Sequence, residues 1–154
     1  MTETLATAKI TRRMSAPPER VYDAWLEPAK LRAWMSAALR QMGQSGETKR
    51  VEVDARVGGK FFFSDMREAG EARHWGTYRV LNRPRKIEFT WIVDASQEAD
   101  PSVVTITIEP DGDGSFVTIL HTMAPEWASY VERVETGWSN MLCAVDGMTG
   151  SAKA

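Results

Sequence analysis

The chain of 154 residues, with 43% hydrophobic and 26% charged side chains, has the composition of one ordinary globular domain. We expect this single domain to span residues 1–154, with an ordered core over about residues 8–148. A formal net charge of −2 gives no electrostatic reason to expect a nucleic acid or an anionic membrane as a partner. The polar Met1–Ala8 segment, and the lack of any apolar run near ~18 residues, predict no signal peptide, no membrane insertion and a cytoplasmic location.

The first part of the chain predicts one strand followed by two short helices. Residues Lys9–Met14 alternate as a strand, and a helix follows over Pro18–Leu26, where prolines occupy the first helical turn. Pro28 ends this helix, and a second one covers about Ala29–Ala37. The segment Gln41–Glu47, rich in Gly, Ser and Gln, predicts a loop.

Six further segments alternate between apolar and polar residues and predict strands joined by turns. The turn signals between them include Gly58-Gly59, the polar Glu68–Glu71, Pro84 and the hairpin sequence Asp111–Gly114. The predicted strands are Lys49–Ala55, Lys60–Met66, His74–Leu81, Lys86–Asp94, Ser102–Glu109 and Ser115–Met123.

The last segment predicts one long amphipathic helix from Pro125 to about Met148, ended by Gly147 and Gly150. Its apolar residues recur at spacings of three and four, which gives one stripe that must be buried against the sheet. The single cysteine, Cys143, cannot form an internal disulfide, in agreement with a reducing compartment. We expect Cys143 to be buried in this helix as a small hydrophobe.

These elements predict an α+β fold. A largely antiparallel sheet of about seven strands carries two short helices after the first strand and wraps around a long C-terminal helix. Alternation along the strands selects the side chains expected on the face toward that helix. These are Phe61, Phe63, Tyr78, Val80, Phe89, Trp91, Val117, Ile119, His121 and Met123.

The order of the segments and several short motifs resemble a known family. The motifs are Ala16–Trp25, Leu31–Met35, Asp54–Phe61, Gly76–Val80, Pro84–Trp91, Thr118–His121 and Gly137-Trp138. With them, about residues 8–148 resemble the helix-grip fold of the START-like or SRPBCC superfamily. The most similar branch is the one related to the C-terminal domain of the activator of Hsp90 ATPase (AHSA1-like).

The resemblance implies a curved antiparallel sheet that grips the C-terminal helix around a hydrophobic cavity. In this superfamily such cavities bind lipids, sterols, polyketides and other apolar molecules, and some branches use them for catalysis. The Hsp90 activator resembles this chain only in its second domain. Its N-terminal domain, which does much of the chaperone engagement, has no counterpart here, so we do not expect a chaperone partner.

Six tryptophans and eight methionines also favour a pocket for an apolar molecule, because tryptophan supplies a large apolar area and methionine adapts to irregular shapes. We therefore expect a small hydrophobic or aromatic ligand between the sheet and the C-terminal helix, with no cofactor. Trp138 would supply apolar area, and His121 or Tyr78 a polar contact that orients the ligand. The candidate ligand-binding residues are Trp34, Phe61, Phe63, Tyr78, Trp91, His121, Met123, Trp138 and Met141.

No catalytic constellation is visible, so the sequence does not favour an enzyme. The two histidines lie on separate predicted strands; we expect His121 to face inward and His74 to be exposed, and they supply no metal-ligand set. Asp65 could face the cavity, but a strand end in water is the favoured position. Gly58-Gly59 lacks the context of a phosphate-binding loop.

Two other functions stay open as alternatives. A polyketide-cyclase-like enzyme would use the same cavity to desolvate and orient a substrate, with His121 or Asp65 essential for turnover. A chaperone-accessory protein would instead expose an apolar patch, for which Trp127 and Tyr130 are the candidates. The basic residues Arg79, Arg83, Arg85 and Lys86 predict a solvated hairpin end and not a nucleic-acid site. The sequence leaves a monomer and a homodimer both open.

Overall fold

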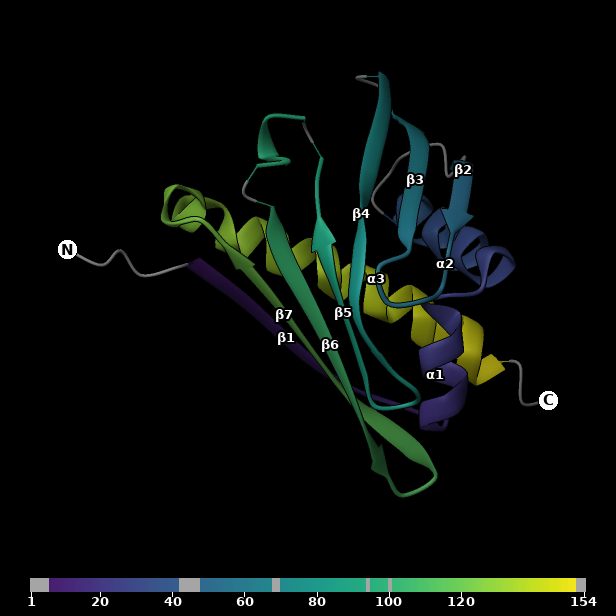
Figure 1. Cartoon of the computed structure of the whole chain (residues 1–154). Helices are drawn as coiled ribbons and strands as arrows, with labels where there is room; N and C mark the ends of the chain where they lie inside the picture. The colour runs from purple at the N-terminus through teal and green to yellow at the C-terminus, as the bar shows by residue number, and fades with distance from the viewer. Residues whose placement is uncertain (1–5, 42–47, 68–69, 94, 100, 152–154) are drawn as a thin grey trace.

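A computed structural model describes residues 6–41, 48–67, 70–93, 95–99 and 101–151, and Figure 1 shows their arrangement. The elements follow the predicted order. In chain order they are β1 (Ala6–Met14), α1 (Pro18–Ala24), α2 (Pro28–Gln41), β2 (Thr48–Val53), β3 (Lys60–Arg67), β4 (Gly70–Asn82), β5 (Lys86–Trp91), η1 (Ala95–Gln97), β6 (Ser102–Asp111), β7 (Gly114–Met123), η2 (Pro125–Tyr130) and α3 (Val131–Ser151). Most of the loop predicted at Gln41–Glu47 lies outside the described residues.

The strands form one seven-stranded antiparallel sheet in the order β1-β7-β6-β5-β4-β3-β2. Each strand from β2 to β7 pairs with its neighbour in sequence, and β1 joins the free edge of β7. The predicted hairpin between β6 and β7 is confirmed, with Gly112 at a φ of 61°, a conformation that favours glycine. The α+β helix-grip architecture expected from the sequence is therefore observed.

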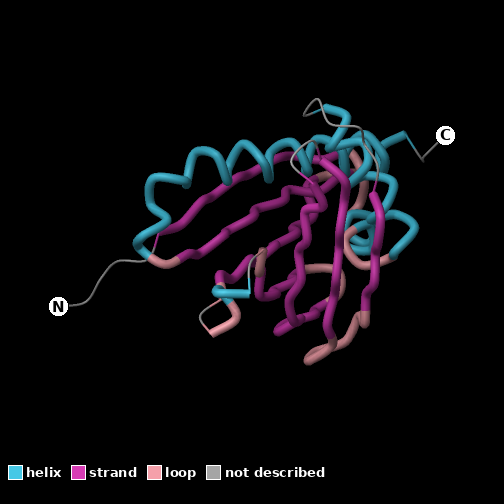
Figure 2. Tube along the Cα trace, turned by 90° about the horizontal axis from the view of Figure 1, so that it is seen from above, coloured by secondary structure: helices cyan, strands magenta, loops and turns pink. Residues whose placement is uncertain are grey.

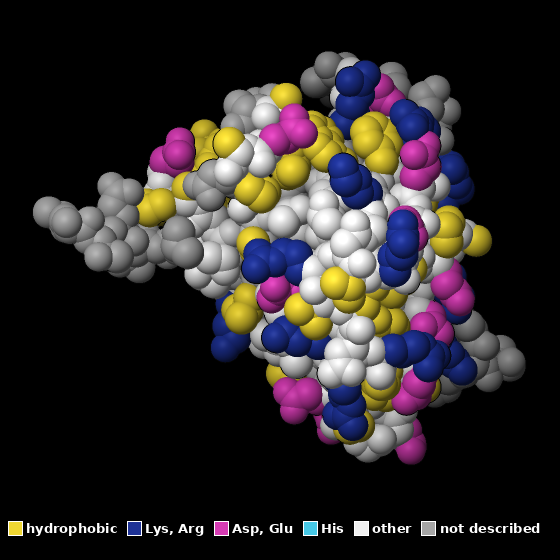
Figure 3. All heavy atoms as spheres, in the orientation of Figure 1, with side chains coloured by type: hydrophobic (Ala, Val, Ile, Leu, Met, Phe, Trp, Pro, Cys, Tyr) yellow, Lys and Arg dark blue, Asp and Glu magenta, His cyan; other side chains and the backbone are white. Residues whose placement is uncertain are grey.

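The sheet curves around α3, which crosses one of its faces (Figure 2). The short helices α1 and α2 pack at the C-terminal part of α3 and close that end of the layer (Figure 1). The opposite face of the sheet carries Lys, Arg, Asp and Glu side chains interspersed among polar and apolar ones (Figure 3). One face of the sheet is thus covered by helices while the other faces solvent.

Polar contacts hold α3 along β1. Arg12 donates two hydrogen bonds to one Asp146 carboxylate oxygen, at 3.1 and 3.0 Å, and the backbone N–H of Ser15 donates to the other at 3.3 Å. Nearer the start of the helix, the backbone N–H of Lys9 donates to the Glu135 carboxylate at 3.0 Å. The helix is therefore anchored to the edge strand at both of its ends.

The sheet departs from the prediction on β4, where Val80 was expected to face the helix. The pairing with β5 shifts between Tyr78 and Val80, so that Tyr78 lies opposite Phe89 and Val80 lies opposite Glu88. Arg79 is therefore the extra residue of a β-bulge. The bulge reverses the alternation, so Leu81, and not Val80, packs against the core. A one-residue shift turns every following side chain to the other face.

The C-terminal helix also departs from the prediction in three respects. Its first turns, Pro125–Tyr130, are a 3-10 helix, and the α-helix begins at Val131. It continues past Gly147 and Gly150 to Ser151. Cys143, expected to be buried, is exposed. It lies four residues after the exposed Ser139, on the side of the helix turned away from the buried Leu142 and Val145.

Candidate functional site: an aromatic cavity between the sheet and α3

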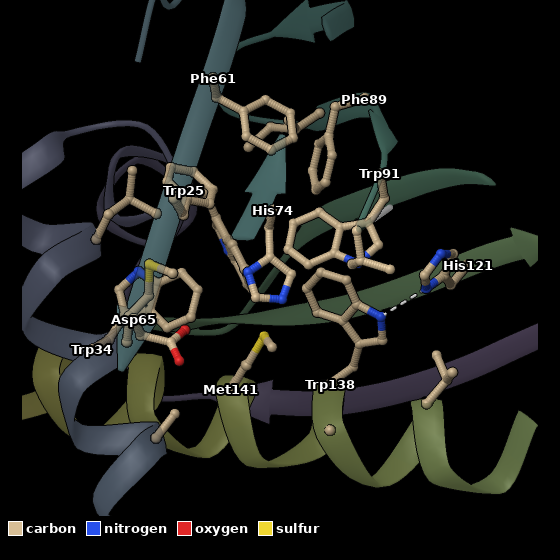
Figure 4. Close-up of a pocket in the computed structure, with 18 of the residues that line it drawn as sticks. Trp25, Trp34, Phe61, Asp65, His74, Phe89, Trp91, His121, Trp138 and Met141 are labelled. Carbon is tan, nitrogen blue, oxygen red and sulfur yellow. Dashed lines mark hydrogen bonds between the residues drawn. The ribbon is translucent and has the colours of Figure 1, made fainter. Parts of the chain in front are cut away.

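A cavity of about 410 Å³ lies between the concave face of the sheet and α3 (Figure 4). Its walls are predominantly aromatic and aliphatic. Four of the six tryptophans line it; Trp75 and Trp127 do not. The apolar lining includes Trp25, Leu31, Trp34, Met35, Phe61, Phe63, Tyr78, Ile87, Phe89, Trp91, Val134, Trp138 and Met141.

The floor of the cavity follows from helical periodicity. Arg133, Val134, Gly137, Trp138 and Met141 recur at spacings of one, three and four along α3 and all line the cavity. Side chains at these spacings share one face of a helix. On the sheet side, alternation along β3 and β5 directs every second residue into the same space.

Ring contacts join the lining into a continuous aromatic wall. The rings of Trp91 and Trp138 are 5.3 Å apart between centroids, and the His74 ring stacks on Trp91 at 4.9 Å with 25° between planes. At the α1 end of the cavity, Trp25 meets Trp34 edge-on at 4.9 Å. Such pairs are each worth about 0.5–1.5 kcal/mol beyond their area burial, so they fix the shape of the cavity.

A directed chain of hydrogen bonds fixes Trp138 at the centre of this wall. The indole N–H of Trp138 donates to Nδ1 of His121 at 3.0 Å (Figure 4). Nδ1 is therefore an acceptor, which assigns the proton to Nε2, and Nε2 donates to Ser102 Oγ at 2.8 Å. Ser102 Oγ in turn donates to the backbone carbonyl of Trp91 at 2.8 Å.

His121 is a neutral positioning residue in this arrangement. Burial lowers the pKa of its imidazole from 6.5 to about 4, so near neutral pH the ring carries a single proton. Both ring nitrogens are already engaged, by Trp138 and by Ser102. The side chain lines the cavity as predicted, but it offers no free nitrogen to a ligand and is a poor general base near neutral pH.

Two polar residues lie where the sequence did not favour them. Asp65, expected in water at a strand end, is only 2% exposed and lines the cavity. His74, expected to be exposed, is half-buried and also lines the cavity through its contact with Trp91. Strand β4 begins at Gly70, before the predicted start at His74, so His74 lies within the β3–β4 ladder opposite Phe63.

Three further polar groups of the lining belong to aromatic residues. The indole N–H of Trp34 donates to the backbone carbonyl of Ala24 at 2.8 Å. By contrast, the Trp25 indole nitrogen and the Tyr78 hydroxyl are buried without a hydrogen-bond partner among the described residues. Burial raises the pKa of Tyr78, so its phenol stays protonated at neutral pH.

Eight of the nine residues predicted for the site line this cavity. The ninth, Met123, lines an adjoining hollow of about 230 Å³ between β7 and η2. The two spaces share Trp91, Val93, His121, Arg133 and Val134. The site prediction omitted Trp25 and Arg133; the helical spacing that selected Trp138 and Met141 could also have indicated Arg133.

The described residues contain no cluster of three or more His, Cys, Asp or Glu side chains with the geometry of a metal site. Within the same residues, every helix is too short or too polar to cross a membrane. What distinguishes the site is therefore its shape and its apolar surface. Its surface is largely apolar, with the polar side chains of Asp65, His74, His121 and Arg133 among the lining residues.

Residues 15–147 match the family described as "Activator of Hsp90 ATPase homolog 1-like protein", and the chain belongs to this family. No curated protein matches the sequence.

Among solved structures, a protein from Chromobacterium violaceum is 29% identical with a TM-score of 0.78, and the match covers 94% of this chain and 97% of that one. An HSP90 activator from Plasmodium falciparum is 24% identical with a TM-score of 0.67, covering 94% and 96%. CalU16 from Micromonospora echinospora is 19% identical with a TM-score of 0.65, covering 97% and 86%. The latter two likenesses show the shared fold alone.

Proposed function

We propose that this protein binds a small hydrophobic or aromatic molecule in the cavity between the sheet and α3. The observation that supports this most directly is an unfilled space of about 410 Å³ whose walls are almost entirely apolar. Binding pockets for small molecules usually have volumes of about 300–1,000 Å³ and a few convergent polar groups. Side chains of the protein itself would be expected to fill such a space if it served the core alone.

Gly137 allows this proposal to be tested without removing any contact. It lines the cavity on α3, and a Cβ at this position would meet no atom within 4 Å. A Gly137→Leu substitution should therefore place an isobutyl group in the space that the ligand would occupy. Gly147→Leu is the matched control, because Gly147 is on the same helix, also has open space around it and does not line the cavity.

The experiment measures the fluorescence of phenylnaphthylamine, an uncharged aromatic dye, titrated with each protein. We expect the wild type and Gly147→Leu to bind the dye alike, and Gly137→Leu to lose most of the binding. Replacing a helical glycine should also raise the free energy of unfolding of both variants by up to about 1 kcal/mol. A loss of dye binding in Gly137→Leu would then not be caused by unfolding. Dye binding that is equal in all three proteins would place the dye elsewhere and refute the proposal.

An enzyme that uses the same cavity is the second candidate, favoured by the nearly buried Asp65 carboxyl and the His74 ring on the neighbouring strand. His121 is the weaker candidate for acid–base work because its pKa is about 4. Turnover of a polyketide-like substrate that Asp65→Asn abolishes, while dye binding persists, would establish this function. The cytoplasmic location and the absence of nucleic-acid and chaperone partners stay predictions.

A further inference from the structure

Arg133 lies where the cavity and the adjoining hollow meet, and it lines both. It is the only Lys or Arg among the described residues that line either space. The side chain is exposed, as is Val93 nearby at 47%, so this junction forms the mouth of the cavity.

The guanidinium of Arg133 is held in place without an ion pair. Its central carbon lies 5.4 Å from the centroid of the Tyr130 ring, a cation–π contact. No carboxylate of the described residues lies within salt-bridge distance of it. By contrast, Arg12 on β1 is paired with Asp146, which lies on α3 like Arg133. Without a carboxylate partner among the described residues, the guanidinium N–H groups stay available, and they match a carboxylate or sulfonate in bidentate geometry.

The cavity has opposite polar groups at its two ends. Arg133 and Met141 are eight residues apart on α3, which corresponds to about 12 Å of helix. Asp65 lies at the Met141 end, as Figure 4 shows. The space between the two ends is lined mainly by apolar side chains, with His74 and His121 as the polar exceptions. An acidic ligand would therefore be oriented with its anionic group toward Arg133 and its apolar body toward the interior.

From this arrangement we propose that the ligand is an amphipathic organic acid, whose apolar body fills the cavity and whose anionic group is bound by Arg133 at the mouth. The inference rests on the proposed function and specifies its ligand class. His121 does not compete for the anion because both of its nitrogens are engaged.

Two dyes with the same ring system distinguish the contribution of the anionic group to binding from that of the apolar body. Anilinonaphthalene sulfonate carries one sulfonate, and phenylnaphthylamine is the uncharged counterpart. Titrations use the wild type, Arg133→Met, Arg133→Lys and, as a matched control, Arg85→Met on the exposed turn after β4. Arg133→Met removes the charge and keeps an apolar side chain about as long as the aliphatic stem of arginine, so most of the apolar wall is retained.

We expect Arg133→Met to bind the sulfonate about tenfold more weakly, the effect of losing one hydrogen bond to a charged group, with no change for the uncharged dye. Arg133→Lys should recover part of the loss, and Arg85→Met should behave as the wild type. Added salt should weaken only sulfonate binding. An equal change for both dyes would overturn the role of Arg133 in anion binding while leaving the cavity proposal intact. Failure of the wild type to bind either dye would overturn both.

Discussion

Acidification should destabilise the protein through His121. The imidazole has an ordinary pKa of 6.5, which we take for the unfolded chain, and a pKa of about 4 in the folded protein because it is buried. Above pH 6.5 the ring is neutral in both states, and the full contribution to stability is present. As the pH falls below 6.5, His121 becomes protonated in the unfolded chain but stays neutral in the folded protein. The free energy of unfolding therefore decreases until the pH passes about 4.

The size of this effect follows from the two pKa values. A difference of about 2.5 pH units between 6.5 and about 4 corresponds to about 3 kcal/mol. That is a large fraction of the free energy of unfolding of a small domain, which is typically about 5–15 kcal/mol. Protonation at Nδ1 would also remove the acceptor of the Trp138 indole N–H, so the acid transition should be accompanied by a change around Trp138.

The assay is urea unfolding followed by tryptophan fluorescence, carried out at a series of pH values between the two pKa values. His121→Gln is the informative variant, because its amide can accept from Trp138 and donate to Ser102 without titrating. The variant should lose about 3 kcal/mol less than the wild type over this pH range. His74→Gln, measured alongside, accounts separately for the other histidine. If wild type and His121→Gln show the same pH dependence, the reasoning about His121 is refuted.

One further substitution and one chemical reaction test the packing. Gly76→Ala would place a Cβ 1.9 Å from the carbonyl oxygen of Thr90 on the neighbouring strand, so we expect a loss of more than about 4 kcal/mol in urea unfolding or failure to fold, whereas Gly137→Ala should be tolerated. The exposed thiol of Cys143 should react with a thiol reagent in the folded protein about as fast as in urea; strong protection in the absence of urea would contradict its position on α3.

The fold could be predicted from the sequence because its signals are regular. The Asp111–Gly114 turn, the alternation of Lys86–Trp91 and the spacing along α3 each point to one secondary structure, and each element was found. The bulge at Arg79 could not be predicted, because an extra residue in one strand leaves no mark in the apolar pattern. The error at Val80 follows directly from it.

The site was predicted less completely for a different reason. Alternation and helical spacing selected Phe61, Trp138 and Met141, which line the cavity, since these patterns are properties of single elements. The places of Asp65 and His74 depend on how far the β3–β4 hairpin extends, and Met123 lines the adjoining hollow because of the path of η2. Such features depend on how neighbouring elements pack, which no local pattern encodes.

Part of the aliphatic core lies away from the cavity, although Leu31 and Ile87 belong to both. Ile106, Ile108, Ile119, Leu142 and Val145 are completely buried, and none of them lines the cavity. Substitutions among the lining side chains can therefore alter which molecule fits while the interlocked aliphatic residues continue to sustain the fold. On the proposed function, a few exchanges at the cavity wall would change which ligand is preferred while these five aliphatic side chains keep their packing.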